Sequence, residues 1–216
     1  MRNAPPHRQQ FGGVGPKYFW DHLVDAEQVA LLDFLVLVTE DESKRERLEE
    51  LLRAGGSEWR VGSRAGSPGL EKRVPQGVAD AADAIIATSA TAGALLSEAW
   101  HAAYGRNPNP EEAYEKAIKA VEEAGAEAVL PKNPKATLGT MIAAVRDQGD
   151  WSLPLESSSA SSAPLEMMRA FGEGRESRQG GNGDRKPTPA GAEAAVLLAV
   201  PLVQYFTAAL VARRTS

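Results

Sequence analysis

The sequence predicts an all-α protein, and three observations lead to that prediction. Apolar residues recur at spacings of three and four along most of the chain, as they do on the buried face of a helix. No segment alternates between apolar and polar residues for long, as a half-buried strand would. Two apolar runs begin with residues that favour helix N-termini, Asn-Pro at 109–110 and Thr-Pro at 188–189.

The composition is that of a globular protein without thiol or metal chemistry. The chain has 216 residues, of which 43% are hydrophobic, so it can form one domain of ordinary size or a domain with a small extension. The formal net charge of -5 means that nucleic-acid binding would need a local basic patch. The absence of cysteine is consistent with a reducing compartment, and we expect a cytoplasmic protein. The three histidines, His7, His22 and His101, are too far apart for a helical zinc pair, so no metal or other cofactor is expected.

The N-terminal part is expected to contain an arm and two helices. Residues 1–17 are rich in Pro, Gly, Gln and Arg, which predicts a disordered arm without a secretory signal. Apolar spacing predicts a helix over 18–38. Thr39 followed by Glu42 is typical of a capping box, so a second helix is expected to begin there and to stop at Gly55-Gly56.

The remaining elements are expected to complete a bundle. Residues 18–75 would form a helical hairpin followed by an irregular connection, and residues 76–214 would form the main helical bundle. The helices expected in this bundle are Gln76–Tyr104, Pro110–Gly125 with Asn109 as cap, Thr137–Arg146, and a final helix that begins at Pro189 with Thr188 as cap.

The segment 152–187, before the final helix, is predicted to be a mobile linker. It contains the low-complexity run "LESSSASSAP" and a short helical stretch at 165–171. A charged, glycine-rich loop follows, "RESRQGGNGDRKPTP", from Arg175 to Pro189. One interpretation is a solvated connection without a binding role.

The other interpretation is a phosphate-binding loop. Arg175, Arg178, Arg185 and Lys186 would stand near the N-terminus of the last helix, where unpaired N–H groups favour anions. Arginine binds phosphate through two parallel hydrogen bonds, and glycine allows the backbone to approach a ligand closely. The loop therefore contains the candidate binding residues of this sequence.

The last helix allows two interpretations. Residues 194–212 carry no charge, and this length approaches the roughly 20 residues that a bilayer span needs, so a tail anchor is one alternative. The many alanines, together with Glu193, Pro201 and Gln204, favour the central helix of a bundle instead. We expect the buried helix and no membrane partner.

Several stretches resemble a group of uncharacterised proteins from actinobacteria and their phages. They include "LSEAWHAAYGRNPNPEEAYEKAIKAVEEAGAEAVLPKNPKATLGTMI" and "EAAVLLAVPLVQYF", and the resemblance covers residues 51–210. The ending is similar to the C-terminal domain of abortive-infection proteins, which belongs to the HEPN group. The resemblance implies a HEPN-like helical bundle, a homodimer or higher homo-oligomer, and a role in phage–host conflict. Many HEPN domains are metal-independent ribonucleases.

The resemblance also implies a degenerate catalytic motif. HEPN ribonucleases carry an arginine followed a few residues later by a histidine. Arg175 takes the place of that arginine, and Arg178-Gln179-Gly180 stands where Arg-His-Gly is expected. RNA cleavage needs a base to remove the 2′-hydroxyl proton, and glutamine does not exchange protons at useful pH. We therefore expect little or no nuclease activity.

Three explanations account for Gln179. The domain is a binding-only relative, or His101 is supplied from a neighbouring helix or the other subunit, or Gln179 is a disabling substitution. The first is favoured and leads to the main hypothesis, a protein that binds RNA or nucleotide phosphate through its arginine-rich loop. The alternatives are a non-enzymatic oligomerisation or interaction module, such as an antitoxin-like or phage accessory protein, and a tail-anchored membrane protein.

Overall fold

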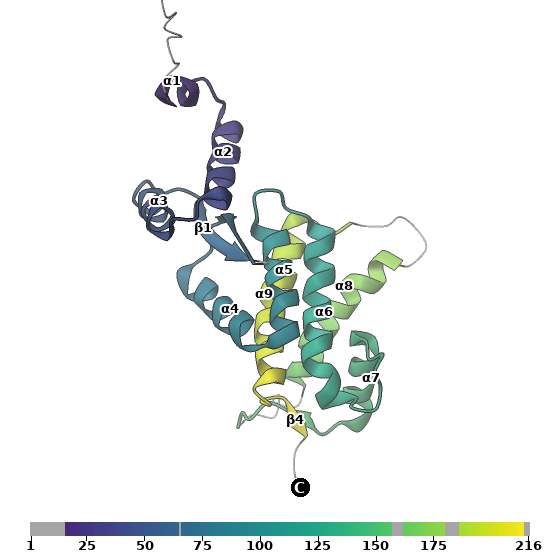
Figure 1. The fold of residues 1–216 in the computed structure, drawn as a ribbon. Helices are drawn as coiled ribbons and strands as arrows, with labels where there is room; N and C mark the ends of the chain where they lie inside the picture. The colour runs from purple at the N-terminus through teal and green to yellow at the C-terminus, as the bar shows by residue number, and fades with distance from the viewer. Residues whose placement is uncertain (1–15, 65, 157–161, 180–185, 214–216) are drawn as a thin grey trace, which may run out of the picture.

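The computed structural model describes residues 16–64, 66–156, 162–179 and 186–213, and this part of the chain is mostly helical (Figure 1). The all-α prediction is confirmed at this level, with only short strands beside the helices. The elements in chain order are α1 (Pro16–Asp21), α2 (Asp25–Val38), α3 (Glu42–Ala54), β1 (Trp59–Arg64), β2 (Ser67–Lys72), α4 (Gln76–Thr88), α5 (Ala90–Tyr104), α6 (Pro110–Val129), α7 (Leu138–Gln148), β3 (Trp151–Ser152), α8 (Ala163–Gln179), α9 (Pro189–Thr207) and β4 (Ala212–Arg213).

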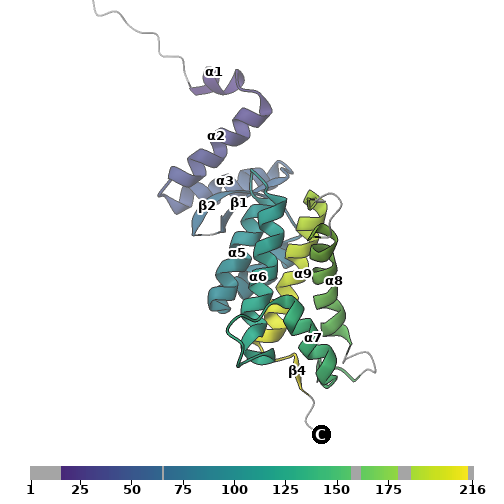
Figure 2. The same ribbon diagram turned by 90° about the vertical axis from the view of Figure 1, so that its right-hand side faces the viewer.

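Three helices form the centre of the molecule. α5, α6 and α9 pack against one another, with α4 against α5 and α9 on one side and α8 against α9 on the other (Figures 1 and 2). The apolar face of α9 is buried, as predicted for a central helix. Its buried residues are Ala192, Ala195, Val196, Ala199, Val200, Leu202, Val203 and Phe206.

The predicted caps of α6 and α9 are confirmed. The Asn109 side chain accepts a hydrogen bond from Glu112 N at 3.3 Å, and Thr188 accepts one from Gly191 N at 3.1 Å. Thr137 caps α7 in the same way. The predicted end of α6 at Gly125 is wrong, because the helix continues to Val129.

Gly125 marks close helix packing instead of a helix end. A Cβ atom there would overlap with the Met141 methyl group and would lie 3.1 Å from the Phe206 ring. Only a residue without a side chain lets α7 and α9 come this close to α6. The last helix also ends earlier than its apolar run, at Thr207.

Two of the predicted helices are broken. The helix expected over 18–38 is divided into α1 and α2, and Pro16 already begins α1, while residues 1–15 lie outside the described residues. The long helix expected over 76–104 is divided at Ser89 into α4 and α5, with Ala90 at a φ of 45°. The first turns of α5 lie very close to the end of α4. A Cβ atom on Gly93 would lie only 3.0 Å from the Ile86 carbonyl carbon.

The cap of α3 differs from the prediction. Asp41, not Thr39, accepts the hydrogen bond from the first turn, at 3.1 Å from Ser43 N. The Thr39 hydroxyl instead donates to the Leu35 carbonyl at the end of α2, at 2.6 Å. The predicted stop at Gly55 is confirmed, since α3 ends at Ala54.

The connection over 57–75 is not irregular but forms a β-hairpin. β1 and β2 pair antiparallel, with Val61 opposite Leu70, and Gly66 supplies a φ of 80° at the turn. The hairpin packs against α2, α3 and α5, and Leu70 is fully buried. These tertiary contacts compensate for a strand sequence rich in glycine and charge.

The linker prediction is also corrected. α8 occupies 163–179 and packs against α7, α9 and β3. The predicted loop therefore begins as a helix, and Arg175, Arg178 and Gln179 belong to its C-terminal end. Residues 157–161 and 180–185 lie outside the described residues.

Candidate functional site

The predicted basic segment joins two helices that pack against each other. α8 ends at Gln179 and α9 begins at Pro189, and both of these ends lie at the same end of the bundle (Figure 1). Arg175 and Arg178 are therefore held on a helical backbone close to the segment that enters α9. For these two residues and Gln179 the description is of the backbone, and Arg185 lies outside the described residues.

Acidic side chains accompany the basic ones at this end of the bundle. The exposed Lys186 ammonium lies 3.3 Å from the Glu111 carboxylate in the first turn of α6. Lys72 lies 3.9 Å from Glu193 in α9. A phosphate ligand would have to compete with these carboxylates for the two lysines.

The buried Tyr104 lies beside the same end of α9. Burial raises the pKa of its phenol to about 12, and the negative charge of Glu193 adds to the effect. The phenol is therefore protonated at neutral pH, and it donates to the Glu193 carbonyl at 3.5 Å. Its contribution is to hold α5 against α9.

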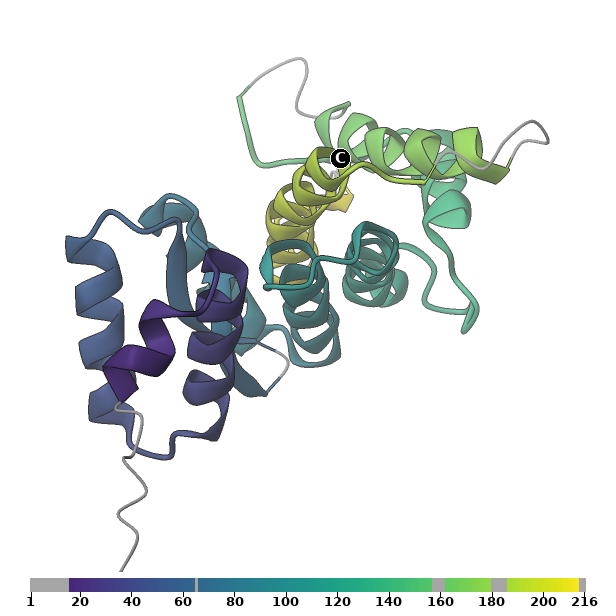
Figure 3. The same ribbon diagram turned by 90° about the horizontal axis from the view of Figure 1, so that it is seen from above.

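His101 does not lie with the α8 residues. It is exposed on α5, one helical turn after Glu98, which pairs with Lys116 of α6. α6 and α9 lie between α5 and α8 (Figure 3). The packing of one copy therefore does not support a catalytic pair of His101 with Arg175 or Arg178.

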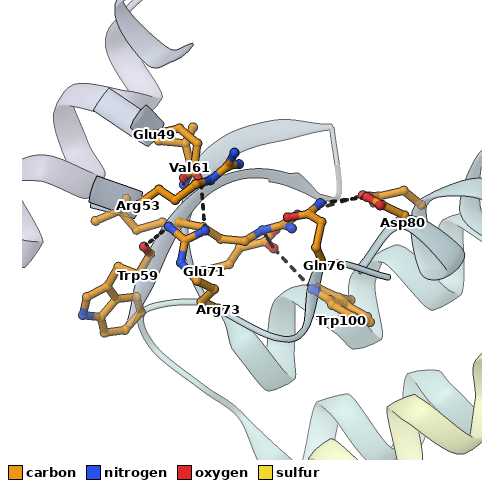
Figure 4. A network of polar contacts seen from close by, with 12 residues as sticks. Glu49, Arg53, Trp59, Val61, Glu71, Arg73, Gln76, Asp80 and Trp100 are labelled. Carbon is orange, nitrogen blue, oxygen red and sulfur yellow. Dashed lines mark hydrogen bonds and ion pairs between the residues drawn. The ribbon is translucent and has the colours of Figure 1, made fainter. Parts of the chain in front are cut away.

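A buried carboxylate beneath the hairpin was missed by the sequence analysis. Glu71 in β2 is only 2% exposed, and its Oε2 accepts a hydrogen bond from Trp100 Nε1 of α5 at 3.2 Å (Figure 4). The same oxygen lies 3.5 Å from Arg60 Nε in β1. The Arg60 guanidinium also lies 3.9 Å from Asp83 of α4. Glu71 and Arg60 together thus connect both strands with α4 and α5.

The neighbouring strand leaves space for this carboxylate. A Cβ atom on Gly62 would overlap with Cδ and Oε1 of Glu71 and would lie 2.7 Å from Oε2. A residue with a side chain at this position would displace the buried group. The glycine in β1 is therefore part of the Glu71 site, although it makes no polar contact through a side chain.

A second part of the network holds α3 to the hairpin. The Glu49 carboxylate accepts hydrogen bonds from Val61 N at 2.9 Å and Arg73 Nη1 at 2.8 Å (Figure 4). Arg73 Nη2 also donates to the Trp59 carbonyl at 2.8 Å. Burial raises the pKa of Glu49, but the hydrogen bonds from Arg73 and Val61 outweigh it and hold the pKa below its ordinary value.

This network is built to hold elements together. Each of its carboxylates faces an arginine or a neutral donor, so its charges are used inside the protein. A hollow of about 430 Å³ beside it has both signs of charge on its wall, from Glu42, Arg45, Arg60 and Asp83. Among the residues that the structure describes, no three potential ligand side chains gather as a metal site.

A larger hollow, of about 580 Å³, lies between α6 and the loop that leads to α7. Its charged and amide residues are Lys119, Glu122, Glu123, Glu127, Lys132 and Asn133. One of its carboxylates already caps α7, since Glu122 accepts from Leu138 N at 2.7 Å. This wall carries both signs of charge and indicates no particular ligand.

Within the described residues, α9 is long and apolar enough for a membrane span by length and composition, and 39% of its most apolar window is buried in the bundle.

Comparison of the chain with protein-family models, with curated proteins and with solved structures finds no match.

Proposed function

We propose that the chain is a binding-only, HEPN-like protein of phage–host conflict that holds RNA or nucleotide phosphate at the junction of α8 and α9. The observation that carries this proposal is the extension of α8 to Gln179. It fixes the backbone of Arg175 and Arg178 at the bundle end where α9 begins. A helix-borne arginine loses less conformational freedom on binding than one on a free loop, which favours affinity.

The charge distribution supports local and salt-sensitive binding. The net charge of the chain is -5, so its overall field does not attract RNA. Binding would come from the guanidinium groups of Arg175 and Arg178, which can form paired hydrogen bonds with phosphate, and from the exposed Lys186. We place this protein in the cytoplasm, where RNA and nucleotides are available.

The proposal does not include catalysis. Gln179 stands where the resemblance expects a histidine, and glutamine cannot take up the 2′-hydroxyl proton. His101 is separated from α8 by two helices in one copy. An RNA that binds at this end would therefore remain intact.

The test is binding of a fluorescent single-stranded RNA over a range of salt concentrations. The double variant Arg175→Ala, Arg178→Ala is compared with Arg47→Ala, Arg146→Ala, which removes two exposed arginines from α3 and α7. Loss of two phosphate contacts makes the negative slope of log K against log salt less steep by about 1.4. Unchanged affinity and slope in the first variant exclude this junction as the site.

A cleavage assay examines the degenerate motif. The natural chain is expected to leave the RNA uncut, and Gln179→His is compared with it in the presence of a metal chelator. Cleavage that appears only with the histidine supports the assignment of Arg175 and Gln179 to the motif. Cleavage by the natural chain contradicts the proposal that it only binds.

A second candidate function is an interaction module in which the arginine segment is inert. It is favoured by the apolar surface of α2, since Phe34, Leu37 and Val38 are all more than half exposed. The third alternative, a tail anchor, predicts that the chain needs detergent to leave the membrane fraction. Full recovery without detergent excludes the tail anchor.

A further inference from the structure

A hollow of about 480 Å³ lies at the turn between α4 and α5. Its wall is formed by the beginning of α5, by the C-terminal half of α6 and by the last residues of α9. The volume is within the range of small-molecule pockets, about 300–1,000 Å³. The phosphate site proposed above lies at the start of α9, so the hollow is a separate place on the molecule.

The N-terminus of α5 opens onto this hollow without a side-chain cap. Ala90, Thr91 and Ala92, the first three residues of the 15-residue helix, all line the wall. The first amides of a helix have no partner within the helix, and the side chain of Ser89, in the cap position, makes no hydrogen bond to them. A helix N-terminus of this kind attracts a negatively charged group such as a carboxylate.

The side chain of Ser89 is a second, independent indication of a ligand. Ser89 belongs to the wall of the hollow and is only 7% exposed. Its buried hydroxyl has no hydrogen-bond partner within the described residues. Since burial of a hydroxyl without a partner is unfavourable, such a group in a folded protein calls for an acceptor or donor from elsewhere. A carboxylate bound at the start of α5 would supply an acceptor.

Another part of the wall carries negative charge. Glu123 and Glu127 are exposed and lie one turn apart on α6. Neither carboxylate forms an ion pair with any residue that the structure describes. Both also border the larger hollow beside α6, but there Lys119 is paired with Glu115 at 2.6 Å. Two carboxylates without a counter-charge favour a cationic group such as an ammonium ion.

We propose that this hollow binds a free amino acid in its zwitterionic form. The carboxylate of the ligand accepts hydrogen bonds from the first amides of α5 and from the Ser89 hydroxyl, and its ammonium group faces Glu123 and Glu127. A simple anion would be repelled by the two glutamates. A simple amine would leave the α5 amides and Ser89 without an acceptor. Only a ligand that carries both charges complements the whole polar wall.

The first test uses L-leucine, because the remaining wall is apolar. Its apolar residues include Ala124, Ala128 and Phe206. Leucine is added to the isotope-labelled full chain up to its solubility limit, and the backbone amide signals are followed by NMR. The signals of the first three residues of α5 are expected to shift and to saturate.

Two derivatives of leucine each remove one charge. N-acetyl-leucine lacks the ammonium charge, and leucine methyl ester lacks the carboxylate charge. Each is expected to bind at least about tenfold more weakly than leucine, because each loses the hydrogen bonds of one charged group. The proposal is overturned if the α5 signals do not move with leucine, or if either derivative binds as tightly as leucine does.

A pair of variants tests the assignment of the ammonium site. Glu123→Gln, Glu127→Gln is expected to raise the dissociation constant of leucine at least about tenfold. The control Glu40→Gln, Glu58→Gln removes the same charge from exposed positions outside α5 and α6, and it should bind leucine like the natural chain. An equal loss in both variants, or no loss in the first, contradicts the assignment.

The variant Ser89→Ala separates contact with the ligand from a structural role. The hydroxyl has no partner within the described residues, so its removal is expected to leave the melting temperature unchanged or to raise it. Leucine binding is expected to weaken by about threefold to tenfold, because one hydrogen bond to the carboxylate is lost. Unchanged leucine affinity, or a lower melting temperature in this variant, contradicts the role of Ser89 in the site.

Discussion

The buried carboxylate of Glu71 is expected to contribute to stability mainly through its charge. The substitution Glu71→Gln keeps the size of the side chain and an oxygen that can accept from Trp100 Nε1. It removes the negative charge that faces Arg60, whose side chain is only 10% exposed. The variant therefore leaves a guanidinium in the interior without its nearest counter-charge.

The size of the effect follows from what remains around Arg60. Removal of one partner from a buried ion pair costs about 3–5 kcal/mol. Asp83 stays at 3.9 Å and is 43% exposed, so it compensates in part. We expect Glu71→Gln to lower the free energy of unfolding by about 3 kcal/mol. For a chain of this length the melting temperature would fall by about 6–12 °C.

Urea unfolding of both proteins, followed by circular dichroism, measures this difference. Glu50→Gln is the control, because its ion pair with Arg47 is largely exposed and is expected to contribute less than about 1 kcal/mol. When Arg60→Met is added, the cost of Glu71→Gln should disappear. A loss below about 1 kcal/mol for Glu71→Gln in the natural background would refute the reasoning.

Two further predictions concern packing and pH. Gly93→Ala is expected to destabilise the protein by at least about 2 kcal/mol, because its methyl group would overlap with the rigid Ile86 carbonyl, whereas Gly77→Ala, which meets open space, should stabilise it by about 0.5–1 kcal/mol; equal melting temperatures for the two variants would contradict this. The pKa of Glu49 is lowered by Arg73, so its contribution is present above the ordinary value of 4.5 and is lost as the pH falls through the lower folded value. Glu49→Gln should therefore flatten the acid limb of stability against pH, and an unchanged acid limb would exclude Glu49 as a cause of it.

The starts of α6 and α9 could be predicted because their signals are local. A cap such as Asn109 or Thr188 bonds to an amide only three residues away, so the sequence contains both partners. Gly125 shows the limit of the same approach. A glycine reads as a helix end in the sequence, but here it permits contact with Met141 and Phe206, which are distant along the chain.

The hairpin and the break at Ser89 could not be predicted for a related reason. The hairpin strands contain few β-forming residues, and contacts with α2, α3 and α5 stabilise them. The break lies in an Ala- and Ser-rich run with no proline or glycine at the turn itself, where Ala90 takes a φ of 45°. Neither the hairpin nor the break at Ser89 could therefore be recognised from the spacing of apolar residues in its own sequence.

The binding role of Arg175 and Arg178 stays a prediction, so only the elements around the candidate site can be compared with the sequence. Charge and glycine content pointed to Arg175 and Arg178, but not to the helix that carries them. In the sequence Glu71 resembles any surface glutamate. Its burial results from the packing of β1, β2 and α5 against one another. Gly62 in the neighbouring strand gave no signal in the sequence either, because its role is to leave space for the Glu71 carboxylate.

The place of α9 in the chain has a consequence for how the protein is made. This helix packs against α4, α5, α6 and α8, all of which precede it. During synthesis the ribosome releases those helices first, and their apolar faces stay uncovered until residues up to 207 have emerged. We therefore expect chaperones to bind the exposed apolar faces of the nascent chain until its final core helix is available.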